Sequence, residues 1–372
     1  MSKNTQFPCQ SCGADLKFAP GTNVLKCPYC GSENEIPAAS RGLGLTDGDQ
    51  EHIRELDYEA YLRDAAPEAE MQEISTVKCQ ACGAETTLPP NTTSAECPFC
   101  GTSIVITTTT TKQIKPTALL PFKLTLKDAQ QKFREWVSGL WFAPNGLKKT
   151  AQLAEGIKGA YLPHWTYDAN ASTDYAGERG DHYYVTEMHK LVRDGKQVTE
   201  SRQVQKTRWK SASGHVRNTF DDVIVPASDS LPREYTEALE PWDLETLAPY
   251  DDQFLSGFRA ESYSVSLEQG FELAKKIMEP KIEETIRQDI GGDEQRIGRK
   301  EIDYSDITFK HILLPLWISA YRYNDKVFRF LVNARTGEVQ GERPWSAFKI
   351  AFAVLCGLGI LVILYLLFAN GG

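Results

Sequence analysis

The sequence predicts an α+β protein with two tetracysteine zinc ribbons, a mainly antiparallel α+β domain and a C-terminal transmembrane helix. Three observations lead to this fold class: a cysteine pattern that occurs twice, a central region in which helical and β-type periodicities alternate, and an uncharged apolar run near the C-terminus. The expected organisation is a first ribbon at 1–37, a linker with an acidic helix at 38–75, a second ribbon at 76–107, the α+β domain at 112–345 and the transmembrane helix at 348–369.

The duplicated pattern uses eight of the nine cysteines. The first set is Cys9, Cys12, Cys27 and Cys30, and the second set is Cys79, Cys82, Cys97 and Cys100. In each set two residues separate the cysteines of a pair, and fourteen residues separate the two pairs. Two such knuckles offer four thiolates, the tetrahedral shell that zinc accepts, and leave no position for water. We therefore expect two structural Zn²⁺ sites, whose binding energy supplies the folding energy of these small units.

Disulfides and iron are the competing interpretations of the cysteines. Disulfides need an oxidising compartment, and no secretory signal precedes Cys9. A rubredoxin-like iron site uses similar knuckles, but we expect a longer, aromatic-rich body between them. Zinc is the interpretation that the spacing favours.

The charge balance argues against nucleic-acid binding. The chain has 372 residues, which predicts two or three domains, and a net charge of −9. In the first ribbon Lys17 and Lys26 are offset by Asp15, and the loop of the second ribbon holds Glu85 and Glu96 but no Lys or Arg. Neither ribbon therefore has the basic, aromatic surface that nucleic-acid binding requires.

The segments that flank the ribbons suggest loose attachment. A Gly-rich stretch at 38–48 is typical of a flexible linker. Ile53, Leu56 and Tyr61 share one helical face within the acidic segment 49–71, which predicts a short helix that packs on the second ribbon or binds a partner. The threonine run at 107–111 is β-prone or a linker. We expect few contacts between the ribbons and the main domain.

Two helices are predicted in the α+β domain. Thr125 with Asp128 is a capping-box-like start, followed by a helical face that comprises Ala129, Phe133, Trp136, Val137 and Leu140. Ser266 with Gln269 begins a second helix, in which Pro280 predicts a kink.

Antiparallel strands are expected in the rest of this domain. Aromatic and β-branched segments between 159 and 226, punctuated by Gly177, Gly180 and Gly214, predict several short hairpin strands with the clearest turn at 193–196. The Pro- and acid-rich segment 227–260 predicts irregular structure. Two further strands, at 309–323 and 327–333, are joined by a turn at 324–326.

The apolar run after Lys349 has no charge for about twenty residues, enough to cross a bilayer as a helix. Arg343 and Lys349 flank its start, which predicts a tail-anchored, single-pass protein of the inner (cytoplasmic) membrane with its N-terminal body in the cytoplasm. Cys356 lies within the run and is interpreted as a small packing residue.

No catalytic motif is found. The sequence lacks a phosphate-binding Gly-x-x-x-x-Gly-Lys-Ser/Thr loop, a His-Glu-x-x-His pair and a Gly-x-Ser-x-Gly elbow. His164 and His311 are interpreted as partly buried sheet residues, and the polar cluster at 178–182 as a surface hairpin. The acidic pairs at 221–222 and 251–252 are interpreted as solvated turns. We expect no enzyme and no catalytic or cofactor-binding residues besides the metal ligands.

The paired ribbons, together with the segments 159–168, 175–180, 314–317 and 332–339, resemble bacterial TFIIB-type zinc-ribbon membrane proteins. Such sequences are often labelled "primosomal protein N′ (replication factor Y), superfamily II helicase". The resemblance implies association with SPFH-domain and phage-shock-type envelope proteins. It does not support helicase activity, because this chain lacks the nucleotide-binding lysine motif and an Asp-Glu-x-His box.

The functional hypothesis is therefore a tail-anchored, zinc-binding membrane adaptor or scaffold that recruits protein partners, among them SPFH or phage-shock-type proteins, without catalysis. The alternative is a membrane-tethered, nucleic-acid-binding zinc-ribbon protein. An unrecognised enzyme in the β-rich domain is the third hypothesis. The sequence leaves the oligomeric state open.

Overall fold

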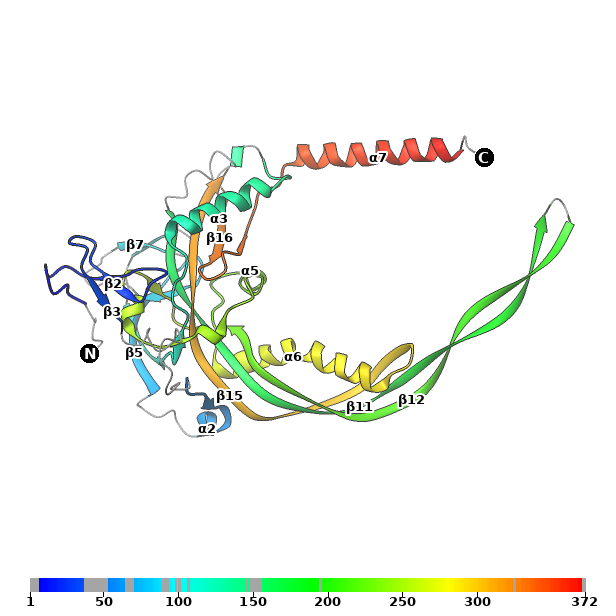
Figure 1. Cartoon of the computed structure of the whole chain (residues 1–372), viewed down its shortest axis with the longest axis horizontal. Coiled ribbons are helices and arrows are strands. Elements are labelled where there is room, and N and C mark those ends of the chain that lie inside the picture. The colour runs from blue at the N-terminus through cyan, green and yellow to red at the C-terminus, as the bar shows by residue number, and fades with distance from the viewer. Residues whose placement is uncertain are drawn as a thin grey trace.

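The computed structural model describes residues 7–36, 53–63, 70–87, 94–97, 99, 102–105, 108–144, 146–147, 156–193, 196–323 and 326–369. Within them the protein is α+β, as predicted: three small sheets of the two cysteine-containing regions lie at one end of a larger sheet from which a long arm projects (Figure 1).

Three very long antiparallel strands dominate the large sheet. They are β11 (Lys158–Arg193), β12 (Lys196–Pro226) and β15 (Glu294–Tyr323), with β11 between the other two. The several short strands expected between 159 and 226 are therefore wrong: the chain forms one hairpin. β11 ends at Arg193 and pairs there with Lys196 of β12, where the sequence predicts a turn; residues 194–195 of that turn lie outside the described ranges.

The glycines that suggested strand ends lie inside the strands instead. A register shift falls between Ala176 and Gly177 in the pairing of β11 with β15. A Cβ on Gly177 would lie 2.2 Å from the carbonyl oxygen of Arg296. Gly177 therefore allows two backbones to approach at a β-bulge, which bends the strand without ending it.

Shorter strands complete this sheet around the base of the long ones. They are β4 (Leu56–Asp57), β10 (Ala118–Leu119), β13 (Ala248–Pro249), β14 (Arg259–Ala260), β16 (Lys326–Asn333) and β17 (Val339–Gly341). β10 is parallel to β15, and β14 is parallel to β11. The turn expected between β15 and β16 is consistent with the pairing of Tyr323 with Lys326, and its residues 324–325 are not among those described.

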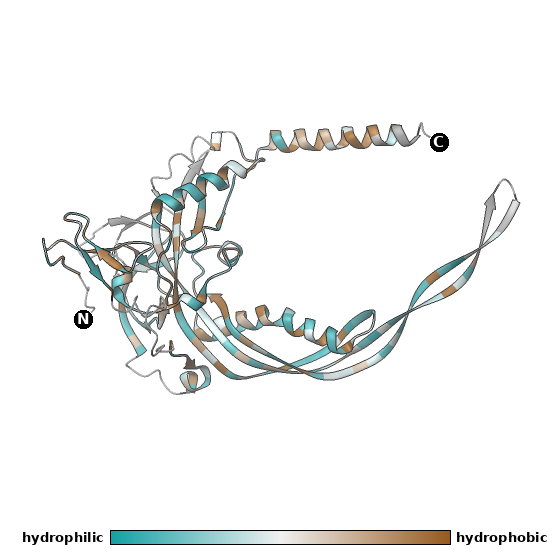
Figure 2. Ribbon diagram, viewed as in Figure 1, coloured by the Kyte–Doolittle hydropathy of each residue, from teal (hydrophilic) through white to brown (hydrophobic). Residues whose placement is uncertain are grey.

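Both predicted helices of the α+β domain are confirmed with their capping boxes. α3 (Leu126–Gly139) begins after Thr125, whose hydroxyl accepts from the N–H of Asp128. α6 (Leu267–Ile290) begins after Ser266, and Pro280 falls inside it. α6 lies along the long strands (Figures 1 and 2) and buries one face against them, with Phe271, Ala274, Met278, Ile282, Ile286 and Ile290 in a shared core. The segment 227–260, expected to be irregular, holds only the short α5 (Arg233–Glu237), η3 (Leu244–Thr246), η4 (Asp252–Leu255) and the two-residue strands β13 and β14.

The acidic helix expected at 49–71 is shorter than predicted. Leu56 pairs with Phe309 at the edge of β15, and only α2 (Tyr58–Arg63) is helical. The residues at 49–52 and 64–69 are outside the described parts. A residue in a β-ladder cannot also continue a helical turn. Because Leu56 pairs with β15, the helix begins only at Tyr58.

The C-terminal helix α7 (Ala347–Ala369) projects from the body (Figure 1). A spanning helix must combine a length of about 20 residues with a predominantly apolar composition. Among the described residues no helix meets both requirements. The predicted transmembrane helix at 348–369 is therefore wrong, and with it the tail anchor and the single-pass, inner-membrane localisation.

Candidate metal centres and their surroundings

The first cysteine cluster lies in the sheet of β1 (Lys17–Phe18), β2 (Val24–Lys26) and β3 (Glu33–Glu35). The Sγ atoms of Cys9, Cys12, Cys27 and Cys30 all lie within 4.8 Å of one another, and the Cys9–Cys30 and Cys12–Cys27 pairs are each 3.5 Å apart. Sulfurs at about 2.3 Å from a tetrahedral zinc are about 3.8 Å apart, whereas a disulfide requires about 2.05 Å. The four thiols are therefore arranged as a metal shell.

The knuckles are built by local backbone hydrogen bonds. The N–H of Cys9 donates to the carbonyl of Ala14 at 2.7 Å, and the N–H of Gly13 donates back to the carbonyl of Cys9 at 2.8 Å. Gly13 has φ +73°, which a residue with a side chain rarely adopts. The same arrangement recurs at Cys27 with Ser32 and Gly31, and at Cys79 with Ala84 and Gly83. The spacing in the sequence therefore dictates the direction of the sulfurs.

The second cluster follows the same plan. The Sγ atoms of Cys79, Cys82 and Cys97 lie within 4.8 Å of one another, with 3.6 Å between Cys82 and Cys97. The predicted fourth ligand, Cys100, lies outside the described residues. The strands around this cluster are β5 (Met71–Lys78), β6 (Glu85–Thr87), β7 (Ser94–Glu96), β8 (Ser103–Val105) and β9 (Thr108–Ile114). Both clusters can hold a metal ion, and their donor sets are compatible with zinc.

The electrostatics of the first cluster favour a cation. Backbone N–H groups of Cys30 and Tyr29 lower the pKa of the Cys27 thiol. Although the N–H of Ala14 acts to lower it, interactions with the thiols of Cys27 and Cys30 raise the pKa of Cys12 to about 12. Ionisation of Cys12 is therefore opposed by the neighbouring sulfurs. A divalent cation would remove that repulsion.

The first ribbon is docked firmly on the body, in contrast to the few contacts expected. Phe18 is buried and meets Phe254 edge-to-face at 5.3 Å between ring centroids. The N–H of Phe18 donates to the carbonyl of Ser256, and the Ser256 hydroxyl donates to the carbonyl of Leu16. Cys9 and Cys27 share one hydrophobic cluster with residues of α3 and β15.

The second ribbon is docked equally closely, at a different place. Phe99, between Cys97 and the predicted ligand Cys100, is fully buried, and it shares a cluster with residues of β10, β11 and β15. Thr86 forms a β-bridge with Glu261. β9 contains most of the threonine run and pairs with β5 along its full length, which shows that the run is a strand. Cysteines of both clusters are buried in the main core. For this reason the expectation of few contacts between the ribbons and the main domain was wrong.

A buried lysine side chain lies under the edge strand β4, away from the cysteine clusters. Lys310 of β15 has a side chain that is 7% exposed, and its Nζ lies 2.7 Å from Asp222 Oδ1, 2.9 Å from Glu55 Oε1 and 4.0 Å from Asp168 Oδ2. Burial acts against its charge, but Asp222 and Glu55 raise the pKa of Lys310. Burial, with a hydrogen bond to Glu55, raises the pKa of Asp168 to about 6. Asp222, expected in a solvated turn, is instead part of this charged cluster.

The two singled-out histidines lie in the sheet, as predicted, but they are fully and not partly buried. His164 of β11 and His311 of β15 are 2% and 3% exposed, and their Nδ1 atoms contact the carbonyls of Leu162 and Ile114 at 3.1 and 2.9 Å. Burial lowers the pKa of each to about 4. Arg179 and Asp181 pair at 2.8 Å on the surface of β11. The predicted polar cluster is thus a surface feature of the arm.

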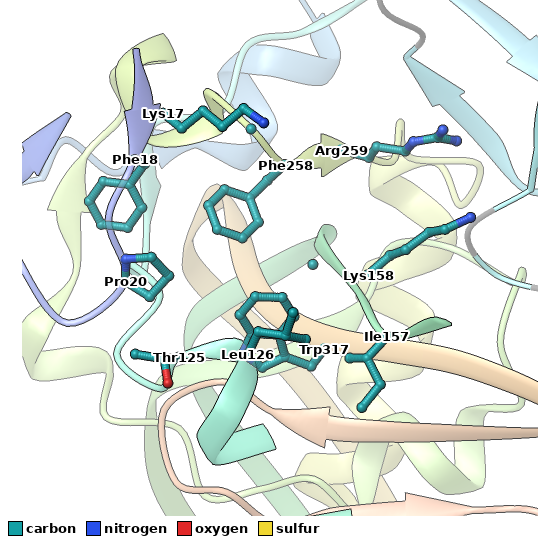
Figure 3. A pocket seen from close by; sticks show the side chains of 12 residues that line it. Lys17, Phe18, Pro20, Thr125, Leu126, Ile157, Lys158, Phe258, Arg259 and Trp317 are labelled. Atoms are coloured by element: carbon teal, nitrogen blue, oxygen red, sulfur yellow. The ribbon is translucent and has the colours of Figure 1, made fainter. Parts of the chain in front are cut away.

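A basic groove at the junction of the first ribbon and the body was not predicted from the sequence. Figure 3 shows Lys17, Lys158 and Arg259 around an apolar floor that includes Phe258 and Trp317. These residues come from four distant segments, so no local pattern joins them. Lys310 did leave a signal, since it is the one charged residue between Ile307 and Tyr321.

No protein-family model matches the chain, and no solved structure matches it. The chain is similar to the uncharacterized protein YdjG of Bacillus subtilis (strain 168), with 25% identity over 346 residues that cover 93% of this chain and 92% of that protein.

Proposed function

We propose that the protein is a zinc-stabilised scaffold that recruits protein partners and performs no catalysis. The observation that carries this proposal is the outer arm, defined as residues 181–193 of β11 and 196–208 of β12. These residues pair with each other, while the pairing of β11 with β15 ends at Gly180 and Glu294. At about 3.3 Å per residue the outer arm is about 40 Å long.

An isolated two-stranded ribbon has almost no core of its own and is marginally stable in water. The outer arm nevertheless exposes large apolar side chains: Tyr184 is 64% and Met188 is 67% exposed. Its charges are partly paired across the strands, as in the 2.7 Å contact of Lys206 with Glu187. Exposed aromatic and methionine side chains of this kind are enriched at protein–protein interfaces. These features support the arm as a surface for a protein partner.

The metal clusters support a structural role for the ions. Each cluster offers thiols alone, and a shell of four thiolates leaves zinc no open position at which to activate water. The four cysteines of the first cluster would hold one Zn²⁺, and Cys79, Cys82 and Cys97, with the predicted Cys100, the second. SPFH-domain and phage-shock-type proteins, implied by the resemblance in sequence, are the first partners to test. Nucleic-acid binding gains no specific support, because Lys206 of the outer arm and Lys210 just beyond it already face Glu187 and Asp181.

The test is a shortened arm. Tyr183 and Lys206 are paired, so residues 184–205 are replaced by Asn-Gly, which forms a tight hairpin turn. Tagged full-length chain, the short-arm variant and the control Cys356→Ser are expressed in cells, crosslinked and purified, and the captured proteins are identified. We expect the control to capture the same partners as the full-length chain and the short-arm variant to lose them. Identical capture by all three would contradict a role of the arm in recruitment.

A further inference from the structure

The groove at the junction of the first ribbon and the body is a preformed hollow of about 420 Å³. It is lined by β1, the start of α3, the start of β11, the segment at 257–259 and Trp317 of β15 (Figure 3). Its volume is in the range of sites that bind small molecules or short peptide segments. The hollow exists only because the first ribbon is docked, since Lys17, Phe18 and Pro20 form one of its walls.

The charged side chains at the rim of the groove are all positive. Lys17, Lys158 and Arg259 line it, and none of its twelve lining residues is acidic. This concentration of positive charge stands on a chain whose net charge is −9. Like charges gathered in a hollow create a local potential that attracts and orients an anion. The rim therefore selects negatively charged groups.

The floor of the groove is apolar and rigid. The Phe258 ring stacks on Phe122 with 4.1 Å between centroids, and the Trp317 indole N–H donates to the carbonyl of Leu124 at 2.9 Å. A Cβ at Gly159 would lie 2.3 Å from the Phe258 ring, so a glycine is needed there. Leu126 adds an apolar side chain that is 39% exposed. A ligand with apolar side chains gains from covering this floor at little ordering cost.

Taken with the proposed function, on which this inference rests, the geometry points to an acidic peptide segment of a partner protein. We propose that the groove binds such a segment, with carboxylates against Lys17, Lys158 and Arg259 and an aromatic or aliphatic side chain on Phe258 and Leu126. Inorganic anions would use the rim alone, because they have nothing to place on the floor. A peptide uses both parts, and recognition of acidic motifs by clustered basic residues is a recurring mode of peptide binding.

The test measures fluorescence anisotropy of labelled dodecapeptides with the full chain. The first probe contains Asp and Glu around two Phe residues, the second replaces each Phe with Ser, and the third replaces the acids with Lys. We expect binding of the first probe, at least tenfold weaker binding of the second, and none of the third. Raising the salt concentration from 50 to 500 mM should weaken binding of the first probe several-fold, since the contacts at the rim are screened.

Two variants assign the binding to the groove. Lys17→Glu/Lys158→Glu should weaken binding of the first probe at least tenfold, and Leu126→Ser, which removes an apolar side chain of the floor and adds no charge, should weaken it while the charges of the rim stay unchanged. The matched control is Arg202→Glu/Lys276→Glu, which makes the same charge change at exposed positions of the arm and α6; it should bind within twofold of the unaltered chain. Circular dichroism and thermal unfolding verify that each variant is folded.

Failure is unambiguous. Absence of binding, equal loss in the control variant, or equal binding of the Phe and Ser probes would overturn the proposal. Tighter binding of a labelled twelve-nucleotide DNA strand that is lost in Lys17→Glu/Lys158→Glu would also overturn it in favour of nucleic acid. If the peptide fails to bind while the short-arm variant still loses its captured partners, the groove proposal falls and the scaffold function stands.

Discussion

The ribbon-bearing end of the molecule and the outer arm use opposite means to hold an extended backbone. In the ribbons, strands that range from two residues in β1 to eight in β5 are fixed by cysteine clusters and by buried residues such as Phe18 and Phe99. In the outer arm, a longer pair of strands is held by its own ladder and by cross-strand contacts such as that of Arg208 with the Tyr183 ring. At its base His182 and Thr207 also contact Glu294, at 2.7 Å each. The strands of the ribbons are held in place by the hydrophobic core and the cysteine clusters, whereas the outer arm lies outside the core.

This difference teaches which part of the molecule is structural. Residues of both ribbons lie in the same hydrophobic clusters as the long strands, so the ribbons and the body form one cooperative unit. The outer arm shares no such cluster beyond its base among the described residues. We therefore expect metal and core changes to affect the whole body, and arm changes to affect binding alone.

The largest expected effect is that of removing the second metal site. Cys79→Ser/Cys82→Ser should abolish its ion and destabilise the whole body, by several kcal/mol, because the apparent binding energy of a structural zinc is of order 10 kcal/mol and Phe99 and Val77 lose their fixed positions in the core. Thermal unfolding and metal analysis check this. The control Cys356→Ser, outside both clusters, should retain two ions per chain and an unchanged midpoint. A body transition unaffected by the double variant would show that the ribbon is an independent unit.

The next effect concerns the buried cation. Lys310→Met should lower the free energy of unfolding by about 3–5 kcal/mol, because Asp222, Glu55 and Asp168 would be left close together without a positive partner. Lys275→Met on the surface of α6, whose partner Glu272 is exposed, should change it by less than about 1 kcal/mol. Chemical denaturation measures both variants. Equal values for the two would mean that the Lys310 cluster contributes no more than a surface ion pair.

A smaller, pH-dependent effect is expected at the contact of the second ribbon with the body. Glu261 is 4% exposed, and burial raises its pKa from 4.5 to about 7. The folded state therefore binds this proton more tightly than the unfolded state, so its contribution to stability is present below pH 4.5 and is lost as the pH rises through 7. Between pH 5 and 8 the unaltered chain should lose about 2–3 kcal/mol that Glu261→Gln does not lose.

Denaturation of both chains at the two pH values gives this difference. The control is Glu245→Gln, at an exposed position in η3, which should follow the unaltered chain at both. Parallel behaviour of Glu261→Gln and the unaltered chain would show that Glu261 ionises in the folded state without cost.

Local patterns in the sequence were enough to predict the cysteine knuckles, both capping boxes and the turn at 193–196. Each depends on residues within about five positions of one another, such as Ser266 and Gln269. Long-range features were not predictable in this way. β11 continues through Gly177 because the backbone of Arg296 approaches there, and β12 continues through Gly214 because the side chains of Asp289 and Tyr175 do. None of these residues is a neighbour in the sequence.

The same limit explains the missed surroundings of the metal centres. The residues that dock the first ribbon, Phe254 and Ser256, lie more than 200 positions from Leu16 and Phe18. The Gly-rich segment at 38–48 suggested independence of the ribbon from the body, but a linker sets only the reach between two units, not whether they pack. The C-terminal run was interpreted as a membrane crossing from its length and its lack of charge, but among the described residues the structure has no helix that satisfies the requirements for such a crossing.

Hydrogen exchange of the full chain, with and without a zinc chelator, tests most directly whether ribbons and body are one metal-dependent unit and the arm a separate one. On metal removal we predict that amides at 9–36 and 71–87 and those of α3 lose protection together. Amides at 181–193 and 196–208 should exchange rapidly in both states. Loss of protection confined to the ribbons, with α3 unchanged, would contradict the account, as would a strongly protected outer arm in the absence of any partner.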